Sequence, residues 1–308
     1  MNETRRRVLA ALADGPVPGP ALAEELDVSR AAVWKHVEAL REAGFEVESG
    51  EAGYALVSVP DEGLEALEFG LDAPFTVEHH DSLDSTNRRA RVLAESGATD
   101  VVVVADEQTG GRGRLDRTWE SPPGGVYLSV VCRPDLSMTR APLYTLAASV
   151  AIARTTREAG VDARIKWPND VLAGEERRKL AGIRTEVQGE TDRVAWLVCG
   201  IGVNADATRE DLPEGATSLR AEGATVSRRV FVQRLLETFD ELRGNPDVVL
   251  PAWRDLALTL GQRVRVETPG GEVVGEAVDV EEPGTLLVDT GEGVVRVSAG
   301  DCEHLRPV

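Results

Sequence analysis

The first sixty residues change from a helical to a strand-like pattern of apolar positions. Val33, Val37 and Leu40 lie on one face of a helix that Ser29 would cap. Three helices followed by two strands around a tight turn is the element order of a winged helix-turn-helix domain. The expected helices cover 5–13, 21–26 and 30–43, and the expected strands cover 45–48 and 54–59.

From Phe75 onward, apolar strand runs alternate with longer helical segments. The β-branched run 101–105 predicts a buried strand, and the run 126–132 is expected to pair beside it. A helix at 141–158 carries almost no charge before Arg154, which indicates deep burial. The other expected elements are strands at 77–80, 164–167 and 196–203, a hairpin leading to 179–183, helices at 84–95, 227–243 and 253–259, and an acidic loop at 205–214.

After Gly261 the chain changes to short strands between turns rich in glycine and proline, which is typical of a small SH3-like β-barrel. These strands are expected at 264–268, 273–280, 286–289 and 294–298. The whole pattern predicts an α+β chain. Its parts are a winged helix-turn-helix domain at 1–60, a linker with a short helix at 61–74, a mixed α/β domain at 75–260 and the barrel at 261–308.

The chain is strongly acidic and poor in lysine. Its 53 acidic residues outnumber 34 basic ones, the formal net charge is −19, and the lysines are Lys35, Lys166 and Lys179. Such a composition resembles that of proteins from halophilic cytoplasms, and an ordinary acidic cytosolic protein is the alternative. Because arginine replaces lysine nearly everywhere, each remaining lysine is a candidate for a chemical role.

Other features concern location and metal chemistry. The sequence has no run of about eighteen apolar residues and no signal-peptide core at its start, so we expect a cytoplasmic protein without a membrane span. Cys132, Cys199 and Cys302 are far apart and form no C-x-x-C pair, which argues against a disulfide framework and a zinc site. The four histidines, including His79 and His80, show no metal-ligand spacing, so we expect no metal cluster.

The segment 110–119, GGRGRLDRTW, follows a predicted buried strand and is the main candidate for a ligand-binding loop. Its glycines allow the backbone to approach a ligand closely. Arg112, Arg114 and Arg117 provide planar, permanently charged donors that suit a phosphate or a carboxylate. On composition alone, a mobile surface loop with solvated arginines fits equally well.

Three further segments carry polar groups at the ends of expected elements. Asp84-Ser-Thr-Asn87 begins a helix, so its hydroxyls can serve as caps or as ligands. Lys166 stands at a strand end beside Trp167, where a buried ammonium needs Asp170 or a bound phosphate as counter-ion. A lysine that extends along the tryptophan to solvent is the alternative. Asn204 follows two glycines and can bind an amide-like edge or simply pack.

Taken in order, these motifs resemble those of the biotin–protein ligases. The segments DSTN, GRGR, KWPND, KLAGI, GIGVN and ATSL follow the family order, and SRAAVWKHVEALREAG resembles the recognition helix of its repressor-type members. Leu115 and Asp116 depart from the small or basic residues usual in that loop. The resemblance covers nearly the whole chain. It implies that the central domain has the class II aminoacyl-tRNA-synthetase-like fold of biotin and lipoate ligases.

The resemblance also implies roles for the matching residues. The catalytic groups would be Lys166, Arg112 and Arg114. Biotin would contact Ser85, Thr86, Asn87, Gln108, Gly111, Arg112, Gly113, Arg114, Lys166 and Gly182. ATP or the adenylate would contact Arg112, Arg114, Arg117, Trp119, Lys166, Asn169 and Asn204. DNA would contact Ser29, Arg30, Trp34, Lys35 and His36.

The implied activity is the formation of biotinyl-5'-AMP from biotin and ATP with Mg²⁺, followed by transfer of biotin to a lysine of a biotin carboxyl carrier domain. A homodimer and biotin-responsive repression at an operator DNA are implied as well. Residues 1–60 nevertheless hold six basic and ten acidic residues, a net charge of −4, which is a weak electrostatic footprint for DNA. Two alternatives stay open: a lipoate–protein ligase-like enzyme and a catalytically inactive biotin-sensing repressor.

Overall fold

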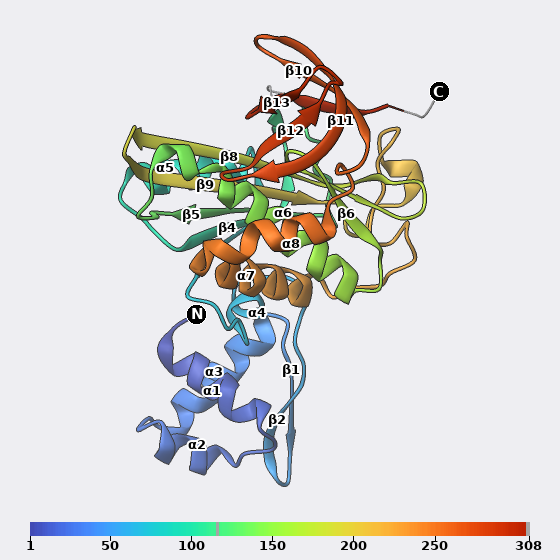
Figure 1. The fold of residues 1–308 in the computed structure, drawn as a ribbon. Helices are drawn as coiled ribbons and strands as arrows, with labels where there is room; N and C mark the ends of the chain where they lie inside the picture. Colours follow the sequence, from blue (N-terminus) through green and yellow to red (C-terminus); the bar gives the residue numbers. More distant parts are fainter. Residues whose placement is uncertain (115–116, 306–308) are drawn as a thin grey trace. The chain divides into compact units, whose positions relative to one another are not determined.

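The computed structural model describes residues 1–114 and 117–305, and the chain divides into two compact units. The first unit holds Met1–Asp72 and Ser227–Gln233, and the second holds Ala73–Val226 and the chain from Arg234 onward. Figure 1 labels many of the helices and strands of both. Within the described ranges, no helix is long and apolar enough to span a bilayer.

The first unit begins with three helices and a two-stranded wing, which confirms the expected winged helix-turn-helix order, and a short fourth helix follows. Its elements are α1 (Glu3–Ala13), α2 (Gly19–Glu25), α3 (Arg30–Glu42), the antiparallel strands β1 (Glu46–Gly50) and β2 (Gly53–Ser58), and α4 (Leu64–Glu68). Leu9, Val37 and Leu40 are fully buried in a shared core. Helix α2 begins before the expected residue 21, because Pro20 fits the first turn of a helix, where its missing N–H is not needed.

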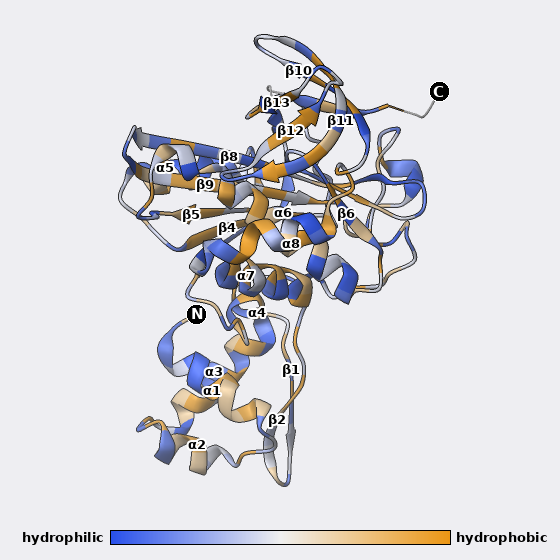
Figure 2. Ribbon diagram, viewed as in Figure 1, coloured by the Kyte–Doolittle hydropathy of each residue, from blue (hydrophilic) through white to orange (hydrophobic). Residues whose placement is uncertain are grey.

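Among the described residues of the second unit, seven strands form one sheet in the order β3-β4-β5-β9-β8-β7-β6. They are β3 (Thr76–Leu83), β4 (Val101–Gln108), β5 (Val126–Cys132), β6 (Ala163–Lys166), β7 (Asp170–Ala173), β8 (Arg178–Glu190) and β9 (Arg193–Val203). Strands β3 and β4 are parallel, and the other neighbours are antiparallel. Strands β4 and β5 pair as expected, and apolar residues dominate both (Figure 2).

Helices cover both faces of this sheet. Helix α5 covers Thr86–Glu95 and packs on β4, β5 and β9, whereas α6 covers Pro142–Glu158 and packs on β6 and β8. Asn87 of α5 donates to Glu186 Oε1, and Thr145 of α6 hydrogen-bonds Thr185, the preceding residue of β8. Neighbouring residues of a strand point to opposite faces, so α5 and α6 lie on opposite sides of the sheet.

The later helices differ in part from the expected positions. Helix α7 (Arg228–Gly244) follows the expected span, whereas α8 (Val249–Leu256) begins and ends earlier than the expected 253–259. The earlier start is tolerated because Pro251 lies in the first turn of α8. Short 3-10 helices include η2 (Met138–Arg140), η3 (Arg209–Asp211) and η4 (Pro246–Val248), and η3 lies within the expected acidic loop.

In the described part of the C-terminal region, five strands form a second sheet in the order β13-β12-β11-β10-β14. They are β10 (Arg263–Thr268), β11 (Gly271–Glu281), β12 (Thr285–Asp289), β13 (Val294–Val297) and β14 (Asp301–His304). The first four match the expected barrel strands. Strand β14 was not expected, because Cys302 is its single buried residue and its sequence shows no apolar alternation. It forms by antiparallel pairing with β10.

Candidate functional site

One cavity of the second unit gathers most of the residues that the motifs predict. The start of α5, described residues of the 110–119 loop, residues of the neighbouring strands β7, β8 and β9, and Asp301 of β14 surround it. The predicted residues that line it are Ser85, Thr86, Asn87, Gln108, Arg112, Gly113, Arg114, Arg117, Trp119, Asn169 and Gly182. Segments that are distant in sequence therefore meet at one place.

A hydrogen-bonded network fixes the polar side chains at the start of α5. Thr86 N and Thr86 Oγ1 both donate to Gln108 Oε1, at 2.8 and 3.1 Å. Ser129 Oγ lies 2.9 Å from Thr86 Oγ1 and 2.7 Å from Asn87 Oδ1. Ser129 is fully buried in β5, and it was not predicted because a single serine within an apolar strand is not distinctive. The network holds polar groups in place without a ligand.

Glycines of β8 and β9 allow cavity side chains to lie directly on the sheet. A Cβ atom at Gly202 would come within 2.7 Å of Trp119 Nε1, and one at Gly200 within 1.8 Å of Asn87 Oδ1. A side chain at either position would displace a cavity residue. Trp119 Nε1 is buried and has no hydrogen-bond acceptor among the described residues, which indicates an acceptor supplied by a ligand.

Lys179, on β8, is a lysine of this cavity that sequence reasoning missed. Its Nζ lies 2.8 Å from Asp170 Oδ1 and 5.3 Å from the centroid of the Trp119 ring, a cation–π distance. The side chain is 38% exposed, so its ammonium group is accessible to a ligand. The signal was present in the sequence, because Lys179 is one of three lysines and belongs to the KLAGI motif.

The arginines of the loop differ in their surroundings. Arg114 donates to Asn169 Oδ1 and to the Gly300 carbonyl, each at 2.9 Å, and burial lowers the pKa of its guanidinium. Arg117 forms an ion pair with Asp301, and that hydrogen bond raises the pKa of Arg117. Arg112 is exposed at the cavity rim. The departures noted at positions 115 and 116 lie outside the described residues. The loop therefore presents cations to the cavity from a framework that β14 completes.

Three predicted residues, Gly111, Lys166 and Asn204, are not among the described residues that line the cavity. Gly111 nevertheless lies against Trp119 and Gln108, and Lys166 pairs with Asp170 in the strand register, so both adjoin it. Asn204 is buried, and its Nδ2 donates to the Thr217 carbonyl at 3.0 Å. The charge of Lys166 acts on His304 instead, where it adds to burial in lowering the histidine pKa to about 4. Asp170, expected as the counter-ion of Lys166, forms its ion pair with Lys179.

The cavity also contains residues that were not among the predicted site residues, although several of them belong to the motifs. Besides Lys179, these are Asp170, Thr118, Ile183, Arg184, Gly200, Ile201, Gly202 and Asp301. Arg184 Nη1 donates to the Gly113 carbonyl at 2.7 Å and so ties the loop to β8. Together with the loop arginines, these groups form a positively charged cavity with two carboxylates, which suits an anionic ligand that brings a metal cation.

The predicted DNA contacts lie on α3 of the first unit. Ser29 Oγ accepts the Ala32 N–H at 3.1 Å and caps the helix, so this hydroxyl has a structural role. Arg30 and Lys35 are exposed, and Trp34 is 53% exposed, which is unusual for so large an apolar side chain. His36 is partly buried, and that burial lowers its pKa. An exposed face with arginine, lysine and tryptophan is therefore available on this helix.

Comparison with family models agrees with this architecture. Residues 4–55 match an HTH domain, residues 80–204 match the biotin/lipoate A/B protein ligase family, and residues 259–305 match the biotin protein ligase C-terminal domain. The residues that line the cavity all lie within the second and third of these ranges. The matches define a protein of the biotin/lipoate ligase class that carries an N-terminal HTH domain.

Individual relatives narrow this class. The bifunctional ligase/repressor BirA of Bacillus subtilis is 38% identical over 93% of this chain and 93% of its own length. The biotin–[acetyl-CoA-carboxylase] ligase of Mycobacterium tuberculosis is 38% identical over 72% of this chain and 86% of its own. The biotin protein ligase of Aquifex aeolicus, solved with biotin and ATP, is 26% identical with a TM-score of 0.63 over 74% of this chain and 99% of its own. The chain belongs to the family of bifunctional biotin ligase/repressors.

Proposed function

We propose that this chain forms biotinyl-5'-AMP from biotin and ATP and then transfers biotin to a lysine of a biotin carboxyl carrier domain. The observation that carries the proposal is the convergence, in one cavity, of a fixed polar network, Lys179 and the loop arginines. In addition, the similar ligase of Aquifex aeolicus was solved with biotin and ATP. A site of this composition can bind a polar ring and an anion side by side.

The start of α5 is suited to the ureido ring of biotin. Thr86, Asn87 and Gln108 present hydroxyl and amide groups whose orientation is fixed by Ser129 and Ser121. Fixed donors and acceptors bind a small ring with little loss of side-chain entropy on binding. Ser85 caps α5 through the Arg88 N–H and lies beside them, so we place it in the same contact set.

The cations of the cavity are suited to the adenylation step. A biotin carboxylate oxygen attacks the α-phosphorus of ATP, a new P–O bond forms, and pyrophosphate leaves. Negative charge moves between the carboxylate, the α-phosphate and the leaving group, so fixed cations lower the barrier. We assign this role to Lys179, with Arg112 and Arg114, and give Lys179 the place that the resemblance had given to Lys166. The indole N–H of Trp119 would donate to the nucleotide.

In the transfer step, the amine of the acceptor lysine attacks the carbonyl carbon of the mixed anhydride and AMP leaves. The side chains that surround the cavity would keep water away from the biotinyl-5'-AMP. Arg117 would exchange Asp301 for a phosphate oxygen when ATP binds, since a guanidinium binds either anion. The loop and β14 would then respond together to the nucleotide.

The residues present fit Mg²⁺ as the companion of ATP. Asp170 and Asp301 are two carboxylates in the same cavity, and Mg²⁺ in nucleotide sites is held by one or two carboxylates and the substrate phosphates. These two side chains would hold the ion. It would neutralise part of the phosphate charge.

We also propose biotin-responsive binding of operator DNA through Arg30, Trp34 and Lys35 of α3. The exposure of these side chains supports the proposal, and the acidic balance of residues 1–60 weakens it. Selection from a random DNA library, with and without biotinyl-5'-AMP, tests it. Lys35→Ala should lose the enrichment, while Arg265→Ala on β10 serves as the matched control. Enrichment that is equal in Lys35→Ala would remove α3 from the interface.

Three further proposals concern the setting of the protein. A homodimer is supported by the edge strand β3, where a second copy could pair with the outer side of the sheet. A net charge of −19 with three lysines supports work in concentrated salt. We also propose that the protein is cytoplasmic.

The enzymatic proposal is tested by product analysis. The full chain, supplied with ATP, Mg²⁺ and biotin, should give pyrophosphate and biotinyl-5'-AMP, and a biotin carboxyl carrier domain should gain the mass of one biotinyl group. Product formation with lipoate in place of biotin would assign lipoate as the substrate. Failure to release pyrophosphate with either acid would leave a sensor that has lost its chemistry.

A further inference from the structure

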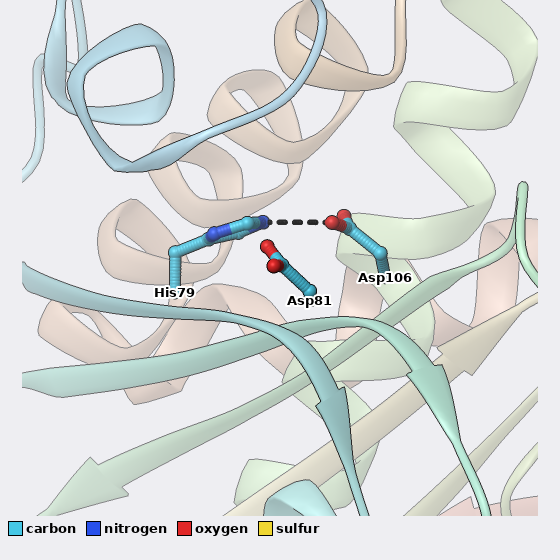
Figure 3. A group of neighbouring side chains, drawn as sticks. All are labelled: His79, Asp81 and Asp106. Carbon is cyan, nitrogen blue, oxygen red and sulfur yellow. Dashed lines mark hydrogen bonds and ion pairs between the residues drawn. The ribbon is translucent and has the colours of Figure 1, made fainter. Parts of the chain in front are cut away.

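Three potential metal ligands meet on one face of the sheet, outside the cavity described above. They are His79 and Asp81 of β3 and Asp106 of β4, and one ligand atom from each lies within 4.8 Å of the others. Figure 3 shows the three side chains turned toward one another. We propose that this cluster is a binding site for a divalent metal ion of the zinc class.

The parallel register of β3 and β4 brings these residues together. The register pairs His80 with Ala105 and Ser82 with Glu107, so Asp81 faces Asp106 across the two strands. His79 is two residues before Asp81 and so lies on the same face. The sequence could not show this group, because Asp106 is 25 positions from Asp81 and joins it through strand pairing alone. The spacing of the histidines gave the opposite expectation.

The charges of the cluster favour a cation. Two carboxylates that face each other on neighbouring strands repel, and the His79 imidazole lies 3.1 Å from Asp106 Oδ2 through its Nε2. Among the described residues, Asp81 has no ion-pair partner. A divalent ion would neutralise both carboxylates at once, which one imidazole proton does for one carboxylate only.

On the opposite face of the same strand, a carboxylate is balanced by an arginine instead. There Glu78 accepts hydrogen bonds from Arg89 and lies 2.6 Å from His80 Nε2, and Arg89 is the main cause that lowers the Glu78 pKa to about 2. An arginine thus balances the carboxylate on that face. This makes His80 a matched control: it is the adjacent histidine on the same strand, beside a carboxylate, but outside the cluster.

The donor set selects the class of metal. One imidazole nitrogen and two carboxylate oxygens suit Zn²⁺ or Co²⁺, whereas Mg²⁺ prefers oxygen ligands alone. Tetrahedral ligands at about 2.1 Å from zinc lie about 3.4 Å apart, so the three side chains need to close by roughly 1 Å. His79 is 9% exposed and Asp106 is 23% exposed, while Asp81 is open to solvent. This leaves a route for the ion and a fourth position for water.

A metal ion here would tie together the two strands that lead into the cavity. Strand β3 ends just before Ser85, and β4 ends at Gln108, both of which line the cavity. The site itself does not depend on the ligase activity, so it is tested by metal binding and thermal stability. Binding to the folded state alone raises the melting temperature with metal concentration.

The test uses the full chain after removal of metals with a chelator. Co²⁺ absorption and Zn²⁺ calorimetry should show about one equivalent bound, and saturating Zn²⁺ should raise Tm by about 2–4 °C. His79→Ala should abolish binding, and Asp81→Asn should weaken it at least about ten-fold. His80→Ala should bind as the parent does. Asp81 is exposed, so Asp81→Asn is expected to keep the fold and the parent Tm without metal.

Several results would overturn the proposal. Absence of Co²⁺ and Zn²⁺ binding in the parent chain would show that His79 merely bridges the acidic side chains. Unchanged binding in both His79→Ala and Asp81→Asn, or loss of binding in His80→Ala, would place the metal elsewhere. Displacement of Zn²⁺ by an equal concentration of Mg²⁺ would reject the zinc class.

Discussion

Removal of the Lys179 ammonium tests the chemical assignment of the cavity. In the proposed adenylation step, Lys179 acts on the carboxylate and the α-phosphate while charge moves between them. Lys179→Ala deletes that charge. It also leaves Asp170 without the partner at 2.8 Å, so that an unbalanced carboxylate faces two anionic substrates. Both changes raise the barrier to adenylate formation.

The size of the effect follows from the geometry. A unit charge about 4 Å from the developing charge contributes about 4 kcal/mol at an effective dielectric constant of about 20. Loss of one fixed donor to a transition-state charge typically costs about 3–4 kcal/mol, or about 100- to 1000-fold in rate. We therefore expect kcat for biotin-dependent ATP–pyrophosphate exchange to fall about 100- to 1000-fold in Lys179→Ala. Lys179→Arg should recover part of this loss, because it restores the charge.

The three lysines of the chain provide the comparison. Lys35→Ala changes an exposed residue of α3 and should exchange as the parent does. Lys166→Ala distinguishes the structural assignment from the motif-based one, since Lys166 does not line the cavity in the described structure. We expect its loss to be clearly smaller than that of Lys179→Ala. An equal or larger loss in Lys166→Ala, with the fold intact by circular dichroism, would refute the reasoning.

Three further changes test other parts of the account. Gly202→Ala should push Trp119 off the sheet and raise KM for ATP about ten-fold or more. Gly244→Ala is the control, because a Cβ there meets open space, and it should leave KM unchanged. An unchanged KM in Gly202→Ala would show that Trp119 does not contact the nucleotide. Arg114→Ala removes two hydrogen bonds that hold the loop. It should release biotinyl-5'-AMP into solution at least about ten-fold faster than the control variant Arg296→Ala. Equal release by the two variants would show that the loop does not retain the adenylate. Burial and Lys166 lower the His304 pKa to about 4, so the unfolded chain takes up a proton near pH 6.5 and the folded chain only near pH 4. Stability should therefore fall as pH drops from about 6.5 to about 4, and a Tm profile equally steep in His304→Gln would exclude this cause.

Local patterns were sufficient to predict much of the fold. The winged helix order, the pairing of β4 with β5 and four barrel strands follow from periodicity and turn residues, which act over a few positions. Predicted helix boundaries were less accurate where the first turn of the helix contains a proline, as in α8. Strand β14 was missed because it owes its existence to pairing with β10, which lies more than thirty positions earlier in the chain.

The site was predicted in outline, but Lys179 was not assigned to it. Most cavity residues belong to short motifs, so the sequence identified them. The choice between Lys166 and Lys179 depends on the strand order β9-β8-β7-β6, because β8 faces the arginine loop and β6 is at the edge. Strand order is a property of the whole sheet. Asp301 and the metal-ligand cluster were missed for the same reason, since each joins its partners through distant pairing.

ATP–pyrophosphate exchange by the full chain in concentrated KCl tests the central claim most directly. The reaction is run with biotin, with lipoate, and with neither acid. Exchange that requires biotin is the expected result. It would show that the chain joins the carboxylate of biotin to AMP. Exchange with lipoate alone, or no exchange with either acid in a folded sample, would contradict the assignment of this chain as a biotin-activating enzyme.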